Sequence, residues 1–535
     1  MKILAVIPAR AGSRGIPNKN IRIIAGHPLI YYAIDHAKRS KYITDIVVTT
    51  DSQEVKIISN QMGVKVKMRE SILCTDDVTL DAVIYDAIPD EKWDYIVTMQ
   101  PTSPTLSVDK LDDAIRYTID EKLDTVISAV NRPHLAWKKV GDKKIPAYKE
   151  RFNRQYLPPY YIETGAFVIS KAECVKHDSR IGNKVDVFEL SEDQAIDIDS
   201  FVDLQNAETV LNKKNIAIYV NGNNSRGMGH VYRALELADE FKIKPDIFYD
   251  KNQTDKEVFG NTKHNLIAVD GINQLFNYCK QKKYGIFIND ILSTSIDYMI
   301  ALRKVLPDCR IINFEDDGEG VYKADAVINA LYNNSDMPNI YAGEKYYISN
   351  KIFLFYKPID IKENVLNVFI SFGGADPQNY SERLLKIISK DEYKKYKFKV
   401  VLGKAKKNVE EIINNYKKDN IEILFDVSNM PEIMAQCDIA VTSRGRTGYE
   451  LAMLGIPTIA MAQNCREEKH GFICEENGFT YIGLNPEDEV IEANLNIYLH
   501  FSKQVREGMQ EKMLEHDLRN GRKRVINIIE NGGIQ

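Results

Sequence analysis

The sequence has few cysteines and no long apolar run, and each scarcity excludes a class of protein. Its 7 cysteines, spread over 535 residues, include no Cys-x-x-Cys pair. This spacing argues for reduced thiols in a cytoplasmic protein and against a structural zinc site. No apolar segment approaches the roughly 20 residues that span a bilayer, so we expect no membrane association. The chain starts directly with an apolar strand pattern, so we also expect no signal peptide.

The chain also carries little excess charge of either sign. The net charge is -5, and no basic block interrupts the chain, so nothing points to general nucleic-acid binding. A hydrophobic content of 44% with 27% charged residues is ordinary for a globular chain. The length exceeds what one hydrophobic core supports, so we expect two to four domains.

The most informative stretch is an apolar run, Ile3–Ile7, followed by a loop with Arg10, Arg14 and Lys19. A continuously apolar run is typical of a buried parallel strand, and two glycines let the loop approach a ligand. Three cations at the C-terminal end of a first strand suit a polyphosphate. The alternative is a solvated basic loop, and the absence of a Gly-Lys-Ser/Thr excludes a Walker A motif.

Strand and helix patterns alternate after this loop. Strands are expected at 45–50, 64–68 and 94–99, and helices at 28–39 and 55–62. This alternation predicts an α/β domain with a parallel sheet that binds its ligand at the C-terminal edge of the strands.

Asp197 and Asp199 are the strongest chemical pair in this half. Residues two apart in an extended segment point to the same side, so the two carboxylates would lie together. Such a pair is unfavourable unless a cation lies between them, and carboxylate oxygens suit Mg²⁺ that arrives with substrate phosphates. The alternative is an exposed polar strand edge.

The segment Pro-Ala-Arg-Ala-Gly-Ser-Arg-Gly-Ile-Pro-Asn-Lys-Asn at 8–20 closely resembles the opening loop of the CMP-sialic acid synthetases, the acylneuraminate cytidylyltransferases. The resemblance extends over residues 1–213 and implies a Rossmann-like nucleotidyltransferase domain that uses CTP, with Mg²⁺ at Asp197 and Asp199. It implies catalytic roles for Arg10 and Lys19. The CTP-binding residues that it implies are Arg10, Ser13, Lys19, Asn20 and, at the base, Arg69, which could instead form a surface ion pair.

The same resemblance bears on the second substrate. Gln100 lies in a Gln-Pro-Thr-Ser-Pro segment that matches the family, which implies a catalytic contact with the acceptor sugar; otherwise it is a turn residue. Lys138 and Arg154 lie in the region that holds the acidic sugar in sialic-acid enzymes. Residues 160–168 keep the glycine of that region but lack the arginine and the later tyrosine that true sialic-acid enzymes often have there. We therefore expect a related 2-keto sugar acid of the nonulosonic class, such as legionaminic or pseudaminic acid, and not necessarily sialic acid itself.

The second half begins with a strand pattern at 216–220 that runs into a glycine-containing turn and His230. The turn lacks the third glycine of the dinucleotide fingerprint, so it indicates a close ligand approach at a strand-to-helix turn, or else a histidine that merely caps or packs. Further strands are expected at 286–289, 310–314 and 367–371. Glycine-rich turns at 372–377 and 442–457 lead into helices, whose N-termini bind pyrophosphate.

Residues 215–535 resemble the two-lobed GT-B enzymes that act on UDP-sugars, and most closely the UDP-sugar hydrolase of pseudaminic-acid biosynthesis. This implies that His230 is the base that activates water and that Glu450 accepts from the uridine ribose. The UDP-sugar-binding residues so implied are Gly229, Arg233, Gly374, Thr447, Glu450 and Asn464. Asn289-Asp290-Ile-Leu departs from the Asp-His-Tyr of that hydrolase, which puts sugar specificity and activity in doubt.

The sequence thus predicts a cytidylyltransferase domain at 1–213, a first GT-B lobe at 214–365 and a second, UDP-sugar-binding lobe at 366–535. The expected protein is bifunctional: it joins CMP to a 2-keto sugar acid and hydrolyses a UDP-amino sugar. The C-terminal half could instead be a glycosyltransferase, a hydrolysing UDP-sugar 2-epimerase or a non-catalytic regulatory module. The resemblance implies a homodimer, and we expect a separate sugar-acid synthase as a partner.

Overall fold

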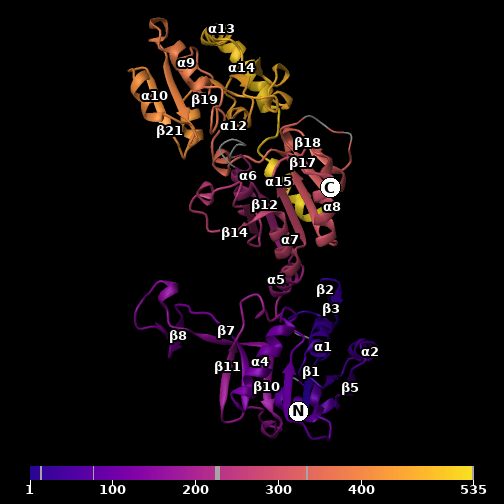
Figure 1. Ribbon diagram of the computed structural model, residues 1–535. Helices are drawn as coiled ribbons and strands as arrows, with labels where there is room; N and C mark the ends of the chain where they lie inside the picture. Colours follow the sequence, from indigo (N-terminus) through magenta and orange to yellow (C-terminus); the bar gives the residue numbers. More distant parts are fainter. Residues whose placement is uncertain (13–14, 76, 223–228, 333–334, 336, 533–535) are drawn as a thin grey trace. The chain divides into compact units, whose positions relative to one another are not determined.

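The computed structural model describes residues 1–12, 15–75, 77–222, 229–332, 335 and 337–532 (Figure 1). The chain divides into two compact units, residues 1–213 and 214–535. We describe each unit by itself. Within the described residues, no helix is both long and apolar enough to cross a bilayer.

The first unit is built on one sheet whose strands follow the order β11-β7-β10-β6-β1-β4-β5. The first strand in sequence, β1, lies inside the sheet between β6 and β4, and all of Ile3–Ile7 is buried. The chain winds outward to β4 and β5 and then returns to place β6 on the other side of β1; β10 alone runs antiparallel to its neighbours β6 and β7. The strands are β1 (Ile3–Pro8), β4 (Asp45–Thr50), β5 (Lys65–Met68), β6 (Tyr95–Met99), β7 (Thr125–Asn131), β10 (Tyr161–Lys171) and β11 (Val185–Glu189).

Amphipathic helices cover this sheet, and hydroxyl side chains start several of them. Ser52, Thr79, Ser107 and Ser200 each accept a backbone N–H at the first turn, as N-caps do. The helices are α1 (Leu29–Arg39), α2 (Gln53–Gln61), α3 (Leu80–Ala87), α4 (Val108–Asp120) and α5 (Phe201–Leu211), with short 3-10 turns η1 (Lys19–Ile21), η2 (Ser71–Cys74), η3 (Arg154–Tyr156) and η4 (Ala172–Cys174). A small hairpin joins β2 (Ile23–Ile24) to β3 (His27–Pro28).

A second hairpin projects sideways from the first unit in Figure 1. It pairs β8 (Trp137–Val140) with β9 (Lys143–Pro146), and every residue of both strands is exposed. Because it packs against no core, the hairpin belongs to the surface of the unit.

The second unit begins with a fully parallel sheet in the order β14-β13-β12-β15-β16-β17-β18, which we call the first lobe. Its strands are β12 (Ile216–Val220), β13 (Asp246–Asp250), β14 (Asn265–Val269), β15 (Ile286–Asp290), β16 (Arg310–Phe314), β17 (Ala326–Asn329) and β18 (Ile340–Ala342). Its helical segments are α6 (Gly229–Ala238), η5 (Lys256–Phe259), α7 (Gly271–Gln281), α8 (Ile296–Val305), η6 (Glu319–Lys323), η7 (Glu344–Tyr346) and η8 (Lys351–Phe355).

The second lobe repeats this winding around its own first strand, β19. Its parallel sheet has the order β21-β20-β19-β22-β23-β24. The strands are β19 (Asn367–Ser371), β20 (Lys397–Leu402), β21 (Ile421–Phe425), β22 (Ile439–Ser443), β23 (Thr458–Ala462) and β24 (Phe479–Leu484). The helical segments are α9 (Tyr380–Ile388), η9 (Asp391–Tyr393), α10 (Val409–Tyr416), α11 (Met430–Met434), α12 (Arg446–Leu454), η10 (Glu467–Lys469), η11 (Glu475–Asn477), α13 (Asp488–Leu499) and α14 (Lys503–Leu514).

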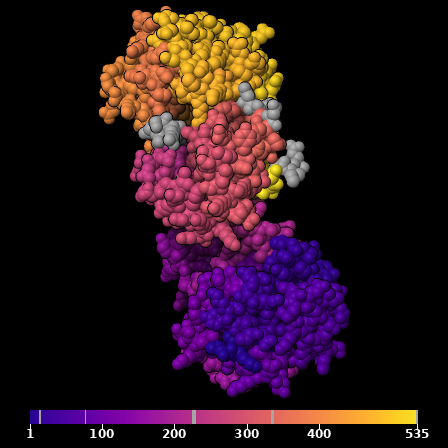
Figure 2. All heavy atoms as spheres, turned by 45° about the vertical axis from the view of Figure 1, so that its right-hand side comes forward, coloured from indigo at the N-terminus to yellow at the C-terminus, as the bar shows by residue number. Residues whose placement is uncertain are grey.

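The last helix, α15 (Gly521–Asn531), packs on the first lobe. Val525, Ile528 and Ile529 join the core of β12, β13 and β15. Arg522 pairs with Glu236 of α6 and with Glu240, two residues after that helix ends. In Figure 2 yellow C-terminal atoms accordingly lie against the pink first lobe as well as on the second. The segment from 366 onward therefore contains a final helix whose packing partners lie in the first lobe.

The described architecture confirms the predicted fold class, a Rossmann-like α/β unit followed by two α/β lobes. In each sheet the first strand is central, and the chain reverses its winding beside it: between β1 and β6, between β12 and β15, and between β19 and β22. Open parallel sheets bind ligands at the C-terminal ends of the two strands that flank such a switch point.

Candidate functional site

Two hydrogen bonds between side chains and backbone shape the loop after β1. Asn20 donates its side-chain amide to the Arg10 carbonyl at 2.9 Å, and the Ala11 N–H donates to Asp51 at the end of β4 at 2.6 Å. Gly12 has φ +64°, a conformation that glycine adopts without strain. These contacts fold the loop back over the end of the sheet. Ser13, also predicted to bind CTP, lies outside the described residues.

Lys19 joins this loop to the distant acidic segment. Its Nζ donates to the Ile198 carbonyl at 2.7 Å and lies 3.2 Å from Asp199 Oδ1. A Cβ on Gly15 would lie 2.4 Å from the Asp199 carbonyl oxygen, so only glycine allows the loop this close. The structure therefore brings the cationic loop and Asp199 together, although 180 residues separate Lys19 from Asp199.

Asp197 lies on the other side of Ile198 and packs on β10. A Cβ on Gly165 would lie 2.9 Å from Asp197 Oδ2, so the carboxylate lies directly against the glycine backbone. Asp197 Oδ1 is buried and has no hydrogen-bond partner in the described structure. A buried carboxylate oxygen without a donor is unfavourable, and a cation beside it would remove that penalty. These oxygen donors thus fit a hard cation such as Mg²⁺, which Asp197 and Asp199 would hold.

Arg69 and Gln100 lie at the same edge of the sheet. Arg69 follows β5 and donates from Nε and Nη2 to the hydroxyl and carbonyl of Thr49 at 3.2 and 3.0 Å. Burial lowers the pKa of Arg69, while neighbouring Asp51 acts in the opposite direction. Gln100 follows β6, and the turn after it carries Thr102, whose carbonyl accepts the Ile198 N–H at 2.9 Å. The turn after β6 therefore borders the acidic segment.

Lys138 and Arg154 lie away from this convergence. Lys138 is on the exposed hairpin, opposite Ile145, and Arg154 starts the short turn η3. Both residues are exposed. The structure thus brings Lys19, Asn20 and the acidic segment together, but it does not bring these two cations to them within the described part of this unit.

A second polar cluster lies at the switch point of the first lobe. Gly229 and His230 start α6 after β12, and Asp290 ends the neighbouring strand β15. His230 Nδ1 hydrogen-bonds Asp290 Oδ1. Arg233, one turn along α6, donates from Nε and Nη2 to the two oxygens of Asp290 at 2.8 and 2.6 Å.

Glu315 completes the cluster from the end of the next strand, β16. Arg233 Nη1 donates to Glu315 Oε1 at 3.2 Å, while Oε2 is buried without a partner in the described structure. Burial would raise the pKa of Asp290, but Arg233 and His230 outweigh it and hold that pKa at about 2. Burial lowers the pKa of His230, which favours the neutral imidazole.

Sequence reasoning missed Asp290 and Glu315. In the sequence, Asp290 stands out only as a departure from a hydrolase motif, and no motif assigns a role to Glu315. The usable signal was topological, because Asp290 ends β15, which neighbours β12, and Glu315 directly follows β16, the next strand of the sheet. A chain that winds back beside its first strand brings such ends to one edge.

The second lobe presents its predicted residues around its own switch point. Gly374 lies exposed in the turn after β19, and Thr447 lies in the first turn of α12 after β22. Glu450, one turn further, is half-buried; burial raises its pKa to about 7 although Arg446 opposes this. Asn464 Oδ1 accepts backbone N–H groups of Arg466 and Glu467 at 3.1 and 3.0 Å, so its amide oxygen is used within the turn after β23.

The two lobes of this unit contact each other beside the His230 cluster and the start of α12. Arg446 Nη2 donates to the Ile348 carbonyl at 2.8 Å, and a Cβ on Gly229 would lie 3.0 Å from Arg446 Cδ. Arg466 donates to the Tyr332 hydroxyl at 2.7 Å and to the Glu315 carbonyl at 3.1 Å. The His230 cluster and the start of α12 therefore belong to one interlobe site.

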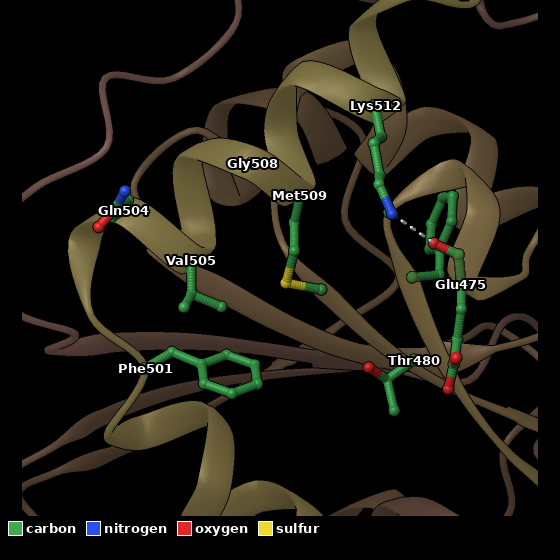
Figure 3. A pocket seen from close by; sticks show the side chains of 10 residues that line it. Glu475, Thr480, Phe501, Gln504, Val505, Gly508, Met509 and Lys512 are labelled. Carbon is green, nitrogen blue, oxygen red and sulfur yellow. Dashed lines mark hydrogen bonds between the residues drawn. The ribbon is translucent and has the colours of Figure 1, made fainter.

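A separate cavity of about 380 Å³ lies in the second lobe between α14 and β24. Figure 3 shows Phe501, Val505 and Met509 facing it, while Lys512 donates to the Glu475 carbonyl at 3.2 Å. Its lining includes none of the predicted site residues, and it lies beside the edge strand β24 rather than at the switch point. The sites are therefore assigned from the switch points and not from this cavity.

Comparison with known proteins bears on the first unit above all. A family model described as cytidylyltransferase matches residues 4–216. The post-translational flagellin modification protein B of Campylobacter coli is 30% identical over 228 residues, which are 40% of this chain and 97% of that protein. The chain belongs to the cytidylyltransferase family. We refer to residues 1–213 from here on as the cytidylyltransferase unit.

Other similar proteins match parts of the chain. N-acylneuraminate cytidylyltransferase A of Danio rerio is 32% identical over 216 residues, which are 38% of this chain and 50% of that protein. The chain thus spans about half the length of this curated relative. Among solved structures, MurG of Acinetobacter baumannii is 14% identical, with a TM-score of 0.45, over 59% of this chain and 99% of that chain.

Proposed function

We propose that the cytidylyltransferase unit transfers CMP from CTP to a 2-keto sugar acid of the nonulosonic class and releases pyrophosphate. The observation that carries the proposal is the contact of Lys19 with the Ile198 carbonyl and Asp199, which joins the loop after β1 to the acidic segment. The family of the unit and the name of the Danio rerio relative support the substrate class.

The reaction is a single displacement in which the anomeric hydroxyl of the sugar acid attacks the α-phosphorus of CTP. Phosphoryl transfer depends mainly on positioning and on neutralising charge. Arg10 and Lys19 neutralise the phosphates, and Asn20 holds the loop through the Arg10 carbonyl. Arg69 lies near the base, and Gln100 contacts the sugar acid at the end of β6.

Asp197 and Asp199 are the residues that would hold Mg²⁺. The unpartnered Asp197 Oδ1 and the largely exposed Asp199 carboxylate leave oxygen atoms for such an ion. A bound Mg²⁺ would neutralise charge on the triphosphate. Because Lys19 already neutralises part of the Asp199 charge, the ion and the lysine would share this carboxylate.

Pyrophosphate release from CTP with a panel of nonulosonic acids tests this function. We expect release only when an acid such as sialic, legionaminic or pseudaminic acid is present together with Mg²⁺. The same panel with the other nucleoside triphosphates controls for base choice. No release with any acid would overturn the proposal, and the acceptor that gives the highest kcat/KM names the substrate. Lys138 and Arg154 remain proposed contacts to that acid.

We further propose that the interlobe site of residues 214–535 hydrolyses a UDP-amino sugar, with His230 as the base that activates water. In this proposal Glu450 accepts from the ribose hydroxyls, and Gly229, Arg233, Gly374, Thr447 and Asn464 surround the ligand. The buried His230–Asp290 contact favours a catalytic site over a merely binding module, because a neutral imidazole is the form that accepts a proton.

Incubating the full chain with UDP-sugars, without CTP and without an acceptor, separates the alternatives. Release of UDP with a free sugar of unchanged configuration at C2 supports hydrolysis. Release with inversion at C2 indicates a hydrolysing epimerase, and release only with an added acceptor indicates a glycosyltransferase. Binding without release indicates a regulatory module. The two proposed reactions fit one sequence of steps in which a separate synthase extends the free amino sugar to the acid; that partner, and a homodimer, are also proposals.

A further inference from the structure

The interlobe site contains a carboxylate that the proposed reaction has not used. Asp290 is fully buried at the end of β15, where its backbone pairs with Val220 of β12. Its two oxygens face α6, where they meet His230 and Arg233. Burial of a carboxylate is unfavourable unless it is paired, so a buried Asp at a strand end needs a specific partner.

The orientation of Asp290 is fixed from both sides. Arg233 grips both carboxylate oxygens, and Arg233 is itself held by Glu315 Oε1 at 3.2 Å and lies over the Phe314 ring at 5.0 Å. A bidentate guanidinium leaves a carboxylate little freedom to rotate. Asp290 Oδ1 is therefore held against His230 Nδ1 by groups from α6, β15 and β16.

We infer that Asp290 is the positioning residue of the interlobe site: it accepts Nδ1–H of His230 and so leaves Nε2 as the nitrogen that takes a proton from water. The inference rests on the proposed hydrolysis. In that step the water oxygen bonds to the anomeric carbon while one water proton moves to Nε2. The bond from the anomeric carbon to the phosphate oxygen breaks, and its electron pair leaves with UDP.

Charge also favours this arrangement. The Asp290 carboxylate and the Arg233 guanidinium neutralise each other, so a neutral imidazole adds no buried charge before the reaction. Once Nε2 is protonated, the adjacent Asp290 stabilises the imidazolium. The other charged groups that act on His230 are Arg233 from α6 and Arg466 from the second lobe, and both disfavour protonation. Asp290 is thus the group that stabilises the protonated form of His230.

The test uses the full chain labelled with ¹⁵N-histidine. The ¹⁵N shifts and couplings of His230, assigned with His230→Gln, report which ring nitrogen carries the proton near pH 7.5. We expect the Nδ1-protonated tautomer in the wild type and its loss in Asp290→Asn. In the UDP-release assay, Asp290→Asn should lower kcat by about 100-fold or more, with KM changed by less than about 3-fold.

Asp246→Asn is the matched control. Asp246 is also a buried carboxylate of the first lobe, paired with Lys282 and Tyr284. It starts β13, however, and so lies at the N-terminal ends of the strands, whereas Asp290 lies at their C-terminal ends. Its replacement should leave the His230 tautomer and kcat unchanged. A wild-type spectrum with the proton on Nε2, or wild-type kcat in Asp290→Asn, would overturn the inference.

The spectrum and the assay separate this inference from the proposed function. If the wild type releases no UDP from any UDP-sugar, the proposed hydrolysis fails, while the tautomer of His230 still decides whether Asp290 positions the ring. If Asp290→Asn does not fold, the wild-type spectrum alone decides the same question.

Discussion

Lys19 connects two stretches of chain that lie far apart in sequence. Its side chain is 12% exposed, and its Nζ contacts the Ile198 carbonyl and the Asp199 carboxylate. Replacing Lys19 with Met keeps much of the side-chain length but removes the charge. We expect kcat for pyrophosphate release to fall about 100-fold or more, as when a charge-stabilising donor is lost. Steady-state assays at saturating CTP and sugar acid measure this.

Lys38→Met is the control for that prediction. Lys38 lies on α1 of the same unit and donates to the Met62 carbonyl at 2.7 Å, away from the loop after β1. Its replacement should change kcat by less than about 2-fold, because exposed single charges contribute little. Equal losses in both variants would mean that Lys19 acts through general electrostatics and not at the site.

Glu450 makes the stability of the second unit depend on pH. Its pKa lies at about 7, above the ordinary value of 4.5, because of burial. The folded state therefore binds the proton more tightly, and its contribution to stability is complete below pH 4.5 and is lost as the pH rises to about 7. Glu450→Gln should thus raise the free energy of unfolding near pH 8 by about 1–2 kcal/mol, and change it little near pH 4.5.

Denaturant unfolding of Glu450→Gln at several pH values measures this difference. Glu489→Gln on α13 serves as the control, since that side chain is exposed and its replacement should change the free energy of unfolding by less than about 0.5 kcal/mol. If the stability of Glu450→Gln relative to the wild type stays constant from pH 4.5 to pH 8, the raised pKa is wrong.

Particular residues show what the sequence could reveal at this scale. The contact of Lys19 with the segment around Asp199 could be predicted. The cationic loop suits a polyphosphate, and the acidic segment suits the Mg²⁺ that accompanies one. The partner of His230 was missed, since Asp290 is 60 residues away and its only signal is its place at the end of a strand beside β12. Asn464 was predicted to bind the UDP-sugar, and its hydrogen bonds to the backbone N–H groups of Arg466 and Glu467 were not predicted. Those bonds depend on the backbone conformation of the turn, which the sequence pattern does not specify.

At the scale of elements, the turns beside the switch points depend on glycine at specific positions. A Cβ on Gly403, after β20, would lie 2.2 Å from the Gly373 carbonyl oxygen and 2.5 Å from Gly374 Cα. Gly403→Ala should therefore displace the turn after β19 and destabilise the fold by about 1–3 kcal/mol. The melting temperature and the affinity for UDP, both measured by calorimetry, should be lower in this variant than in the wild type.

Gly508 provides the opposite case for comparison. It lies inside α14 at the cavity of Figure 3, and a Cβ there meets nothing within 4 Å. Gly508→Ala should stabilise the protein by about 0.5–1 kcal/mol, because alanine loses less backbone entropy in a helix. If both variants shifted stability in the same direction, the steric argument for Gly403 would be wrong.

The elements themselves were largely readable from hydrophobic pattern. The strands at 45–50, 216–220, 310–314 and 367–371 have the predicted bounds, since buried parallel strands are continuous apolar runs ended by turns. The antiparallel direction of β10, the exposed β8–β9 hairpin and the return of α15 to the first lobe were not predicted. Each depends on which surface a segment packs against, and periodicity does not specify that partner.

At the scale of the whole molecule, each proposed reaction uses residues of a single unit. Lys19 and Asp199 lie in residues 1–213, and His230, Asp290 and Glu450 lie in residues 214–535. If each site is complete within its unit, the reactions should be separable by mutation. His230→Ala should abolish UDP release and keep pyrophosphate release within about 2-fold of the wild type. Lys19→Met should lower pyrophosphate release by about 100-fold or more and keep UDP release within about 2-fold.

The double variant sharpens this prediction, because independent sites give additive changes in activation free energy. Carrying His230→Ala together with Lys19→Met, the chain should lose each activity by the factor that its single variant shows. An equimolar mixture of the two single variants should retain both activities at half the wild-type rate. A loss of pyrophosphate release in His230→Ala greater than about 10-fold would instead show that the UDP-sugar site controls the cytidylyltransferase unit. Folded content, checked by circular dichroism on the same samples, excludes global unfolding as the cause of such a loss.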